Sequence, residues 1–275
     1  VLLQLAGDLR TGIVIDNPQI MQYVVEENIS KWGLKTEQVK NDALNNLAKE
    51  SKPGFEEVEK GIFRSVWADG FDASRLLIPG LFKGLGIEKD ILAMASNADS
   101  VWVTDGSKPE NVAALIKKAV PALLEEGHPL TPDLLILKND TWRLFKLESD
   151  HPAYGMQEEL FKLWMDDIYA QQQQTLRQIY QDENNDPFIA TYTVSQKAGR
   201  VVTYCAWTQG ITIPFWLPKT DLIVFVPEDG ESFPIQWARV EAVLGKLPVV
   251  KSIDAPLRYE VEDFPSEEQF KAMME

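Results

Sequence analysis

The stretch DSVWVTDGSKPENVAALIKKAV, Asp99–Val120, contains a short apolar strand, an Asp-Gly turn and an amphipathic helix in that order. A second stretch, DLIVFVPEDGESFPIQWARVEAVL, Asp221–Leu244, follows the same order. In each, the apolar run before Asp-Gly is typical of a strand, and the apolar spacing after it predicts a helix. We therefore predict an internal repeat in which Asp-Gly starts the helix. Strand–turn–helix is also a common arrangement, so two unrelated units are the alternative.

Outward from these stretches, strands and helices follow one another without a regular alternation. This order predicts an α+β fold, with mixed or antiparallel sheets and packed helices, rather than a doubly wound sheet. The expected strands lie within Val1–Leu5, Gly12–Tyr23, Ile62–Trp67, Leu134–Lys138, Trp142–Lys146, Phe188–Ser195, Val201–Thr208, Ile211–Leu217 and Leu222–Val226. The expected helices lie within Thr36–Lys49, Asp72–Leu85 and Gly155–Tyr180, with a short last helix that starts at Ser266.

A chain of 275 residues is long enough for two domains of ordinary size. The polar segment Glu148–Pro152 ends regular structure and separates the two stretches. We therefore expect one α+β domain over residues 1–149 and a second over residues 150–275. The repeat would make the second domain a divergent copy of the first.

The chain is strongly acidic, with 27 Lys and Arg against 42 Asp and Glu and a formal net charge of −15. Nucleic acids and anionic membrane surfaces both bind concentrated positive charge. We therefore expect neither nucleic acid nor a membrane as a partner, and the simplest consequence of the charge is solubility. No apolar stretch approaches the about 20 residues of a membrane-spanning helix.

Cys205 is the single cysteine, so the chain cannot form an internal disulfide. This fits a reducing compartment, and no signal-peptide pattern occurs near Val1, so we expect a cytoplasmic protein. Cys205 lies among apolar and aromatic residues in VVTYCAWT, which reads as a strand. A thiol buried there would be unreactive, because apolar surroundings raise its pKa.

Motifs for several chemistries do not occur in the sequence. The nucleophile motif G-x-S-x-G is absent, and the glycine-rich segment Pro79–Gly86 has neither phosphate-loop order. His128 and His151 each precede a proline, and with one cysteine they do not supply zinc ligands at ordinary spacing. We therefore expect no cofactor.

A segment with calcium-loop character fails at its decisive positions. Asp182, Asn184 and Asp186 imitate the start of such a loop. Pro187 stands where the sharp turn needs Gly, and Thr193 stands where the bidentate Glu belongs. We read the segment as an Asn/Asp turn between helix and strand, and we predict no metal site.

One polar cluster flanks the ends of two expected strands. It lies in Asp69–Arg75 and Ser96–Asp99, and its candidate catalytic residues are Asp72, Arg75, Asn97 and Asp99. Asp72 or Asp99 could act as a general acid or base while Arg75 holds an anion. In the structural alternative, Asp72 or Asp99 caps a helix or turn and Arg75 is the ion-pair partner.

The second half contains a set of aromatic residues. They lie on its expected strands and on the helix expected at the end of the stretch Asp221–Leu244. Strand alternation places some of them outside, where they could line a groove for a partner or ligand. The alternative is that these large side chains fill the core. The candidate binding residues are Trp207, Trp216 and Trp237.

Segments of the first half resemble the YtpQ-like family of uncharacterised bacterial proteins. They are ENISKWGLKTEQVKNDALNNL (27–47), FDASRLLI (71–78), AMASNADSVWVTDG (93–106) and HPLTPDLLILKNDTWRLF (128–145). Asn97 and Asp99 match a family segment of the form P-N-R-D, with Ala98 in place of its Arg. Pro218–Asp221 is similar to a looser version of it. The resemblance implies an α+β fold and a bacterial cytoplasmic protein, and it implies no activity or catalytic residue.

Two functions follow as hypotheses. The first is a non-catalytic binding or interaction module, with a protein partner or a homo-oligomer, because catalytic motifs are scarce. The second is a metal-assisted hydrolase that uses Asp69, Asp72 and Asp99 near strand ends. An open cleft that holds the polar cluster would favour the hydrolase, and full pairing of its residues would disfavour it.

Overall fold

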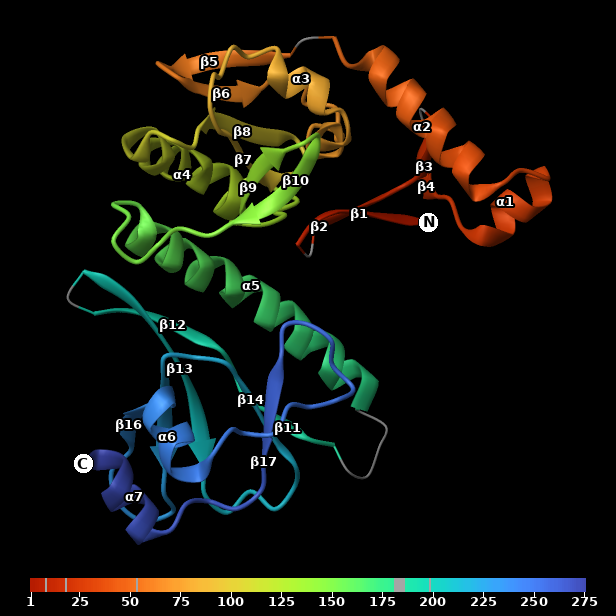
Figure 1. Ribbon diagram of the computed structural model, residues 1–275. Helices are drawn as coiled ribbons and strands as arrows, with labels where there is room; N and C mark the ends of the chain where they lie inside the picture. Colours follow the sequence, from red (N-terminus) through yellow and green to blue (C-terminus); the bar gives the residue numbers. More distant parts are fainter. Residues whose placement is uncertain (8, 18, 53, 181–185, 198) are drawn as a thin grey trace. The chain divides into compact units, whose positions relative to one another are not determined.

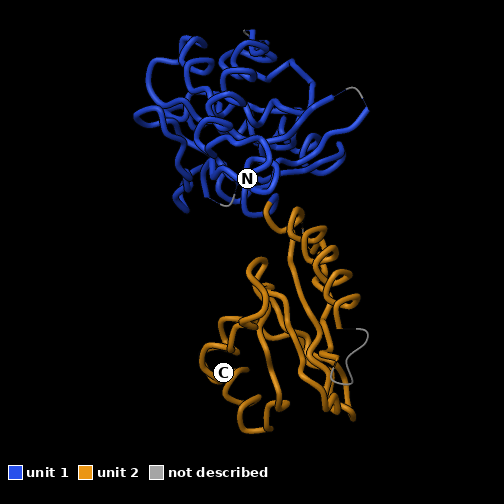
Figure 2. Tube along the Cα trace, turned by 90° about the vertical axis from the view of Figure 1, so that its right-hand side faces the viewer, with its two compact units in different colours: residues 1–160 blue, residues 161–275 orange. Residues whose placement is uncertain are grey.

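The computed structural model describes residues 1–275 except 8, 18, 53, 181–185 and 198, and it has an α+β fold (Figure 1). Two compact units make up the chain, Val1–Leu160 and Phe161–Glu275 (Figure 2). Their boundary falls inside helix α5, Tyr154–Tyr180, rather than at residue 149. The helix expected from Gly155 is confirmed. None of the described helices is long and apolar enough to cross a membrane.

A six-stranded antiparallel sheet forms the centre of unit 1, in the order β10-β9-β7-β8-β6-β5. Its two middle strands are buried along almost their whole length, because both faces of the sheet are covered. The strands are β5 (Phe55–Glu59), β6 (Ile62–Ser65), β7 (Ile91–Asn97), β8 (Ser100–Asp105), β9 (Leu134–Lys138) and β10 (Thr141–Phe145).

Helix α4, Pro109–Leu124, packs on one face of this sheet against β7 and β8. The other face contacts the 3-10 helix η1 (Ala73–Leu77) and helix α3 (Pro79–Lys83), whose Phe82 is fully buried. The two expected strands Leu134–Lys138 and Trp142–Lys146 correspond to the β9–β10 hairpin, which turns at Asn139 and Asp140, both with positive φ. The sheet thus lies between two layers of helix.

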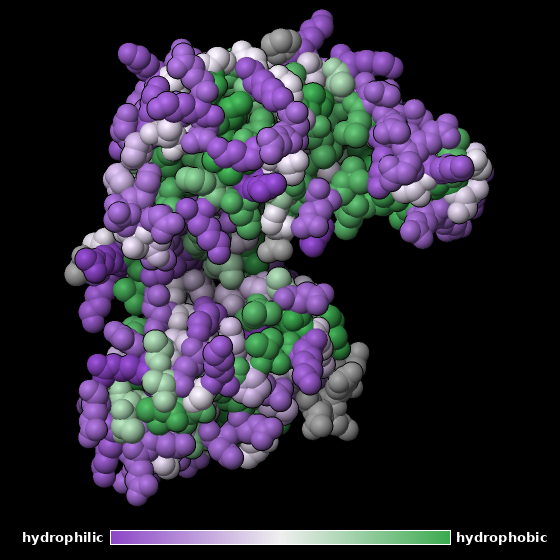
Figure 3. All heavy atoms as spheres, viewed as in Figure 1, coloured by the Kyte–Doolittle hydropathy of each residue, from purple (hydrophilic) through white to green (hydrophobic). Residues whose placement is uncertain are grey.

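The first 50 residues form a smaller group of elements around their own core. Ile13, Val24, Ile29 and Val39 pack together there. Hydrophobic residues gather where this group meets the rest of unit 1 (Figure 3). The elements are β1 (Leu2–Ala6), β2 (Leu9–Gly12), β3 (Val14–Asn17), β4 (Ile20–Tyr23), α1 (Glu26–Trp32) and α2 (Thr36–Glu50).

Unit 2 contains two small mixed sheets, of order β12-β13-β15-β16 and β11-β14-β17. Its core is aromatic, with Trp207, Phe215, Phe225 and Trp237 among the buried residues. The elements are β11 (Phe188–Ile189), β12 (Thr193–Lys197), β13 (Arg200–Thr208), β14 (Phe215–Pro218), β15 (Leu222–Val226), β16 (Phe233–Gln236), α6 (Trp237–Leu244), β17 (Arg258–Val261) and α7 (Glu267–Met274).

The two stretches that predicted a repeat differ in build. In the first, β8 ends at Asp105 and α4 follows the Asp-Gly turn, as expected. In the second, Asp229 and Gly230 lie between β15 and β16, and α6 starts only after β16. The expectation that Asp-Gly starts the second helix is therefore wrong. Phe233–Gln236 pair with β15 as a strand, which the helical spacing concealed.

Candidate functional site

Arg75 is the centre of the polar cluster that the sequence singles out. Its side chain is 1% exposed, and its guanidinium donates two parallel hydrogen bonds to the Asp69 carboxylate, of 2.7 and 2.6 Å. Its Nε donates to the Ser51 hydroxyl at 2.8 Å, and the group stacks over the Trp67 ring at 4.4 Å. The hydrogen bond from Arg75 lowers the pKa of Asp69. Arg75 therefore has no free face for an external anion.

Asp72 lies behind this ion pair and is 0% exposed. One of its oxygens is 3.9 Å from the Arg75 guanidinium, and neither oxygen has a hydrogen-bond partner. Burial raises the pKa of Asp72, and the neighbouring Ser65 hydroxyl lowers it without reaching hydrogen-bond geometry. Asp72 precedes η1 but its side chain does not cap it. The capping alternative is therefore wrong for Asp72.

Asn97 and Asp99 form hydrogen bonds that connect neighbouring segments. The Asn97 amide donates to the Ala122 carbonyl at 2.9 Å, and its oxygen accepts the Asp99 backbone N–H at 3.0 Å. The Asp99 carboxylate accepts the backbone N–H of Gly70. Asn97 is buried, and each residue holds a turn in place, which fits the structural alternative for this pair.

The four candidate catalytic residues thus adjoin one another in a closed network rather than in an open cleft. Two of them, Asp72 and Arg75, are essentially inaccessible to solvent. Among the described residues, no three His, Cys, Asp or Glu side chains are grouped so that they could hold a metal ion. The imitation calcium loop lies mostly outside the described residues, at 181–185. The hydrogen bonds of this network hold the surrounding loops in place, and the burial of Asp72 and Arg75 leaves little room for a substrate.

The network holds two segments in place. Ser51, which accepts from Arg75, also donates to the Leu47 carbonyl at the end of α2. Asp69 accepts the Phe71 backbone N–H, and the Phe71 carbonyl accepts the Arg75 backbone N–H. Arg75 therefore ties the last turn of α2 to the loop that carries Phe71.

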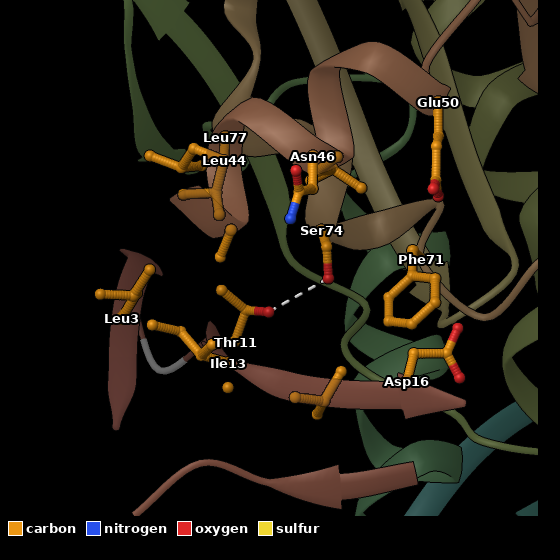
Figure 4. A pocket seen from close by; sticks show the side chains of 14 residues that line it. Leu3, Thr11, Ile13, Asp16, Leu44, Asn46, Glu50, Phe71, Ser74 and Leu77 are labelled. Atoms are coloured by element: carbon orange, nitrogen blue, oxygen red, sulfur yellow. Dashed lines mark hydrogen bonds between the residues drawn. The ribbon is translucent and has the colours of Figure 1, made fainter. Parts of the chain in front are cut away.

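A cavity of about 290 Å³ lies where these two segments face the N-terminal strands (Figure 4). Its apolar lining includes Leu3 on β1, Ile13 between β2 and β3, Leu44 and Leu47 on α2, and Leu77 on η1. The Thr11 and Ser74 hydroxyls are 3.1 Å apart across it, so either can donate to the other. This hydrogen bond joins the N-terminal strands to η1.

The polar rim of the cavity carries side chains without partners. Asp16 on β3 and Glu50 at the end of α2 both line it, with the Phe71 ring between their carboxylates in Figure 4. Within the described part of the chain, Asp16, Asn46 and Glu50 have no side-chain ion pair or hydrogen bond. An open cavity with an apolar floor and free polar groups is the usual form of a small-molecule site.

No local pattern in the sequence marks this cavity, because its residues come from segments far apart in the chain. Phe71 and Ser74 belong to the polar segment Asp69–Arg75, which was singled out for its charged members. Leu44 and Leu47 lie on the apolar stripe of α2, which predicts burial. An apolar stripe on α2 that is longer than its buried part would be the sequence signal for such a cavity.

The three candidate binding residues of unit 2 are core residues. Trp207, Trp216 and Trp237 are 3%, 6% and 3% exposed. Trp216 also donates to the Glu260 carboxylate at 2.7 Å across the β14–β17 pair. Their rings stabilise the unit, and none forms an exposed aromatic surface.

Asp221 and Cys205 also have structural roles: Asp221 is hydrogen-bonded and ion-paired, and Cys205 is buried. The Asp221 carboxylate accepts the backbone N–H and hydroxyl of Thr203, at 2.8 and 3.1 Å, and pairs with Lys162 at 2.9 Å. It therefore anchors the start of β15 much as Asp99 anchors the start of β8. Cys205 is fully buried, and burial raises its pKa to about 12, as expected for an unreactive thiol.

Arg258 is a second buried arginine, on β17 in unit 2. It is 0% exposed and donates to the Gln172 side chain at 2.7 Å and to the Ala190 carbonyl at 2.7 Å. None of the described carboxylates forms an ion pair with it, and burial lowers its pKa to about 10. Arg258 thus joins α5 to the segment that follows β11 through neutral acceptors.

Comparison with known proteins adds no relative. No protein-family model, curated protein or solved structure matches this chain. The resemblance to the YtpQ-like family and the internal repeat therefore stay predictions, and the functional argument rests on the geometry of the chain itself.

Proposed function

We propose that this chain is a non-catalytic binding module of the bacterial cytoplasm, and that the cavity between β3, α2 and η1 is its binding site. The observation that carries the proposal is the contrast between two sites in unit 1. The catalytic candidates are paired and closed, with Arg75 at 1% exposure. The cavity is open, and Asp16, Asn46 and Glu50 on its rim have no side-chain partner among the described residues.

A fragment screen by ligand-observed NMR tests this proposal. Leu47→Trp fills the cavity, and Ile179→Trp is the matched control on an exposed position of unit 2. We expect fragments that bind the wild type and the control but not Leu47→Trp. Fragments that bind all three alike, or no fragment that binds the wild type, would contradict the site.

The interaction part of the proposal concerns a protein partner or a homo-oligomer. It is supported by apolar side chains that the N-terminal strands leave in solvent, with Leu2, Ile20, Met21 and Tyr23 between 52% and 67% exposed. Exposed apolar groups of this kind are common at protein interfaces. Native mass spectrometry, of the pure chain and of chain recovered from its source cell, should detect an oligomer or a partner. A strictly monomeric chain without a partner would refute this part.

A metal-assisted hydrolase is the competing proposal. Asp69 and Asp99 are partly exposed, so these two carboxylates could reach a metal ion at the edge of the network. Thermal shift with millimolar Mg²⁺, Mn²⁺ and Ca²⁺ separates the proposals, because an ion that binds the native state raises Tm. A rise in Tm that Asp99→Asn removes would favour the hydrolase.

A further inference from the structure

We propose that the cavity takes a small organic cation, an ammonium group on an apolar body. The inference rests on the proposed function, since it names the ligand class for the same cavity. The cavity volume of about 290 Å³ is at the lower end of the usual range for ligand sites, which selects a small molecule.

The charges of the lining favour a cation. Asp16 and Glu50 approach from β3 and α2, two elements far apart in the sequence, and none of the residues that line the cavity is Lys, Arg or His. Both carboxylates lack a cationic partner among the described residues. A chain with net charge −15 adds a negative field that attracts cations and repels anions.

Phe71 supplies a second, independent feature for the same ligand class. Its ring lies between the two carboxylates in Figure 4, and no described aromatic ring stacks against it. The negative face of an aromatic ring attracts ammonium groups, and it does so more strongly where water is excluded. Two carboxylates and an unstacked ring in the lining of one cavity suit an alkylammonium group better than a metal ion.

The rest of the cavity suits the body of such a ligand. Leu3, Leu44, Leu47 and Leu77 form apolar walls for an alkyl chain. The Thr11 and Ser74 hydroxyls have lone pairs that can accept an N–H. A bare metal ion binds oxygen ligands only, so it would make no contact with these apolar walls.

Isothermal titration calorimetry with three six-carbon probes tests the ligand class. Hexylammonium, hexanol and hexanoate share their chain and differ in charge. We expect hexylammonium to bind at least about tenfold more tightly than the other two, and less tightly as salt rises. Amide shifts at Leu47, Phe71 and Ser74 in two-dimensional NMR should follow the titration.

Substitutions assign the preference to the carboxylates. We expect Asp16→Asn and Glu50→Gln each to weaken hexylammonium about three- to tenfold and to leave hexanol unchanged. Asp42→Asn, an exposed position of α2 that does not line the cavity, removes the same charge and should leave both unchanged. Phe71→Leu should weaken the ammonium probe more than hexanol.

The outcomes separate this inference from the proposed function. Equal or tighter binding of hexanol or hexanoate overturns the cation inference and leaves the cavity as a binding site. Binding of screened fragments in the cavity, without binding of hexylammonium, has the same meaning. Hexylammonium binding that Asp42→Asn weakens as much as Asp16→Asn shows general charge attraction and also overturns the inference. If neither the screened fragments nor any of the three six-carbon probes binds the wild type, both proposals are overturned.

Discussion

Arg75 binds Asp69 through two parallel hydrogen bonds, of 2.7 and 2.6 Å, while the Asp72 carboxylate lies behind the pair without a hydrogen bond. The exposed carboxylate therefore receives the strong contacts and the buried one receives only the nearby charge. This order makes Arg75 a support for the surrounding loop and for α2, and the cavity beside them depends on it.

Replacement of Arg75 should strongly destabilise unit 1. Arg75→Ala leaves Asp72 buried without a cation, and we expect a loss of about 3 kcal/mol or more in the free energy of unfolding, measured by urea denaturation. Asp72→Asn in the same chain should recover part of the loss. Arg143→Ala, at an exposed position, should stay within about 0.5 kcal/mol of the wild type. Equal losses for Arg75→Ala and the double variant would exclude a charge effect.

The raised pKa of Asp72 predicts a pH dependence of stability. The pKa of Asp72 is raised above its ordinary value of 3.8, so the native state binds this proton more tightly than the unfolded state does. As pH rises from 3.8 through the raised pKa, ionisation of this carboxyl therefore lowers the free energy of unfolding. Asp72→Asn should therefore be more stable than the wild type at neutral pH, and its advantage should shrink as pH falls toward 3.8. Urea denaturation between pH 4 and 8 measures both. Parallel curves would show that Asp72 does not titrate differently on folding.

Gly54 is required by the ring of Trp67. A Cβ at Gly54 would lie 2.5 Å from the indole, whose Nε1 donates to the Lys52 carbonyl and whose face carries Arg75. Because that ring is held, we expect Gly54→Ala to cost about 1–3 kcal/mol. Gly80→Ala, with open space at the same distance, should be neutral or slightly stabilising. Thermal denaturation of the two variants compares them, and equal Tm values would contradict the steric role.

Removal of Arg258 should expose its importance for unit 2. Arg258→Met keeps an unbranched side chain but leaves the acceptors at Ala190 and Gln172 without their donor, which we expect to cost about 2–4 kcal/mol. Arg200→Met is the exposed control in the same unit. The free energies of unfolding in urea compare the two, and similar values for both would refute the structural role of Arg258.

Cys205 should resist thiol reagents in the folded protein. Its pKa is raised to about 12 by burial, so almost no thiolate exists at pH 8 and the sulfur is inaccessible. We expect no reaction with Ellman's reagent over minutes in buffer and complete reaction of one thiol in 6 M guanidinium chloride. Rapid labelling of the native protein would contradict the burial of β13.

Local patterns predicted much of the secondary structure. Helices α2 and α5, strands β9 and β10, and the last helix α7, whose N-cap is Ser266, all lie where expected. These features depend on neighbours within a few residues, so they can be read from the chain directly. The apolar spacing predicts a helix from Pro234, whereas Pro234–Gln236 belong to strand β16, because their conformation depends on pairing with β15.

The candidate site shows the same division. The segments Asp69–Arg75 and Ser96–Asp99 are recognisable from their polar residues next to expected strands, and the structure brings them together. Whether these residues are paired or free depends on which side chains face one another, and that cannot be read from spacing. The cavity residues Asp16 and Glu50 carried no local signal.

The sequence by itself determined the α+β class, the helices and hairpins with local signals, and the unreactive setting of Cys205, because periodicity, turn chemistry and an apolar strand are properties of neighbouring residues. Only the tertiary structure decided that Asp-Gly at 229–230 joins two strands, that Arg75 is closed off by Asp69, and that β3, α2 and η1 enclose a cavity. Those outcomes depend on contacts between segments far apart in the chain. The two stretches of the predicted repeat share a strand before Asp-Gly, which is a property of neighbouring residues, and they differ after it because Phe233–Gln236 pair with β15.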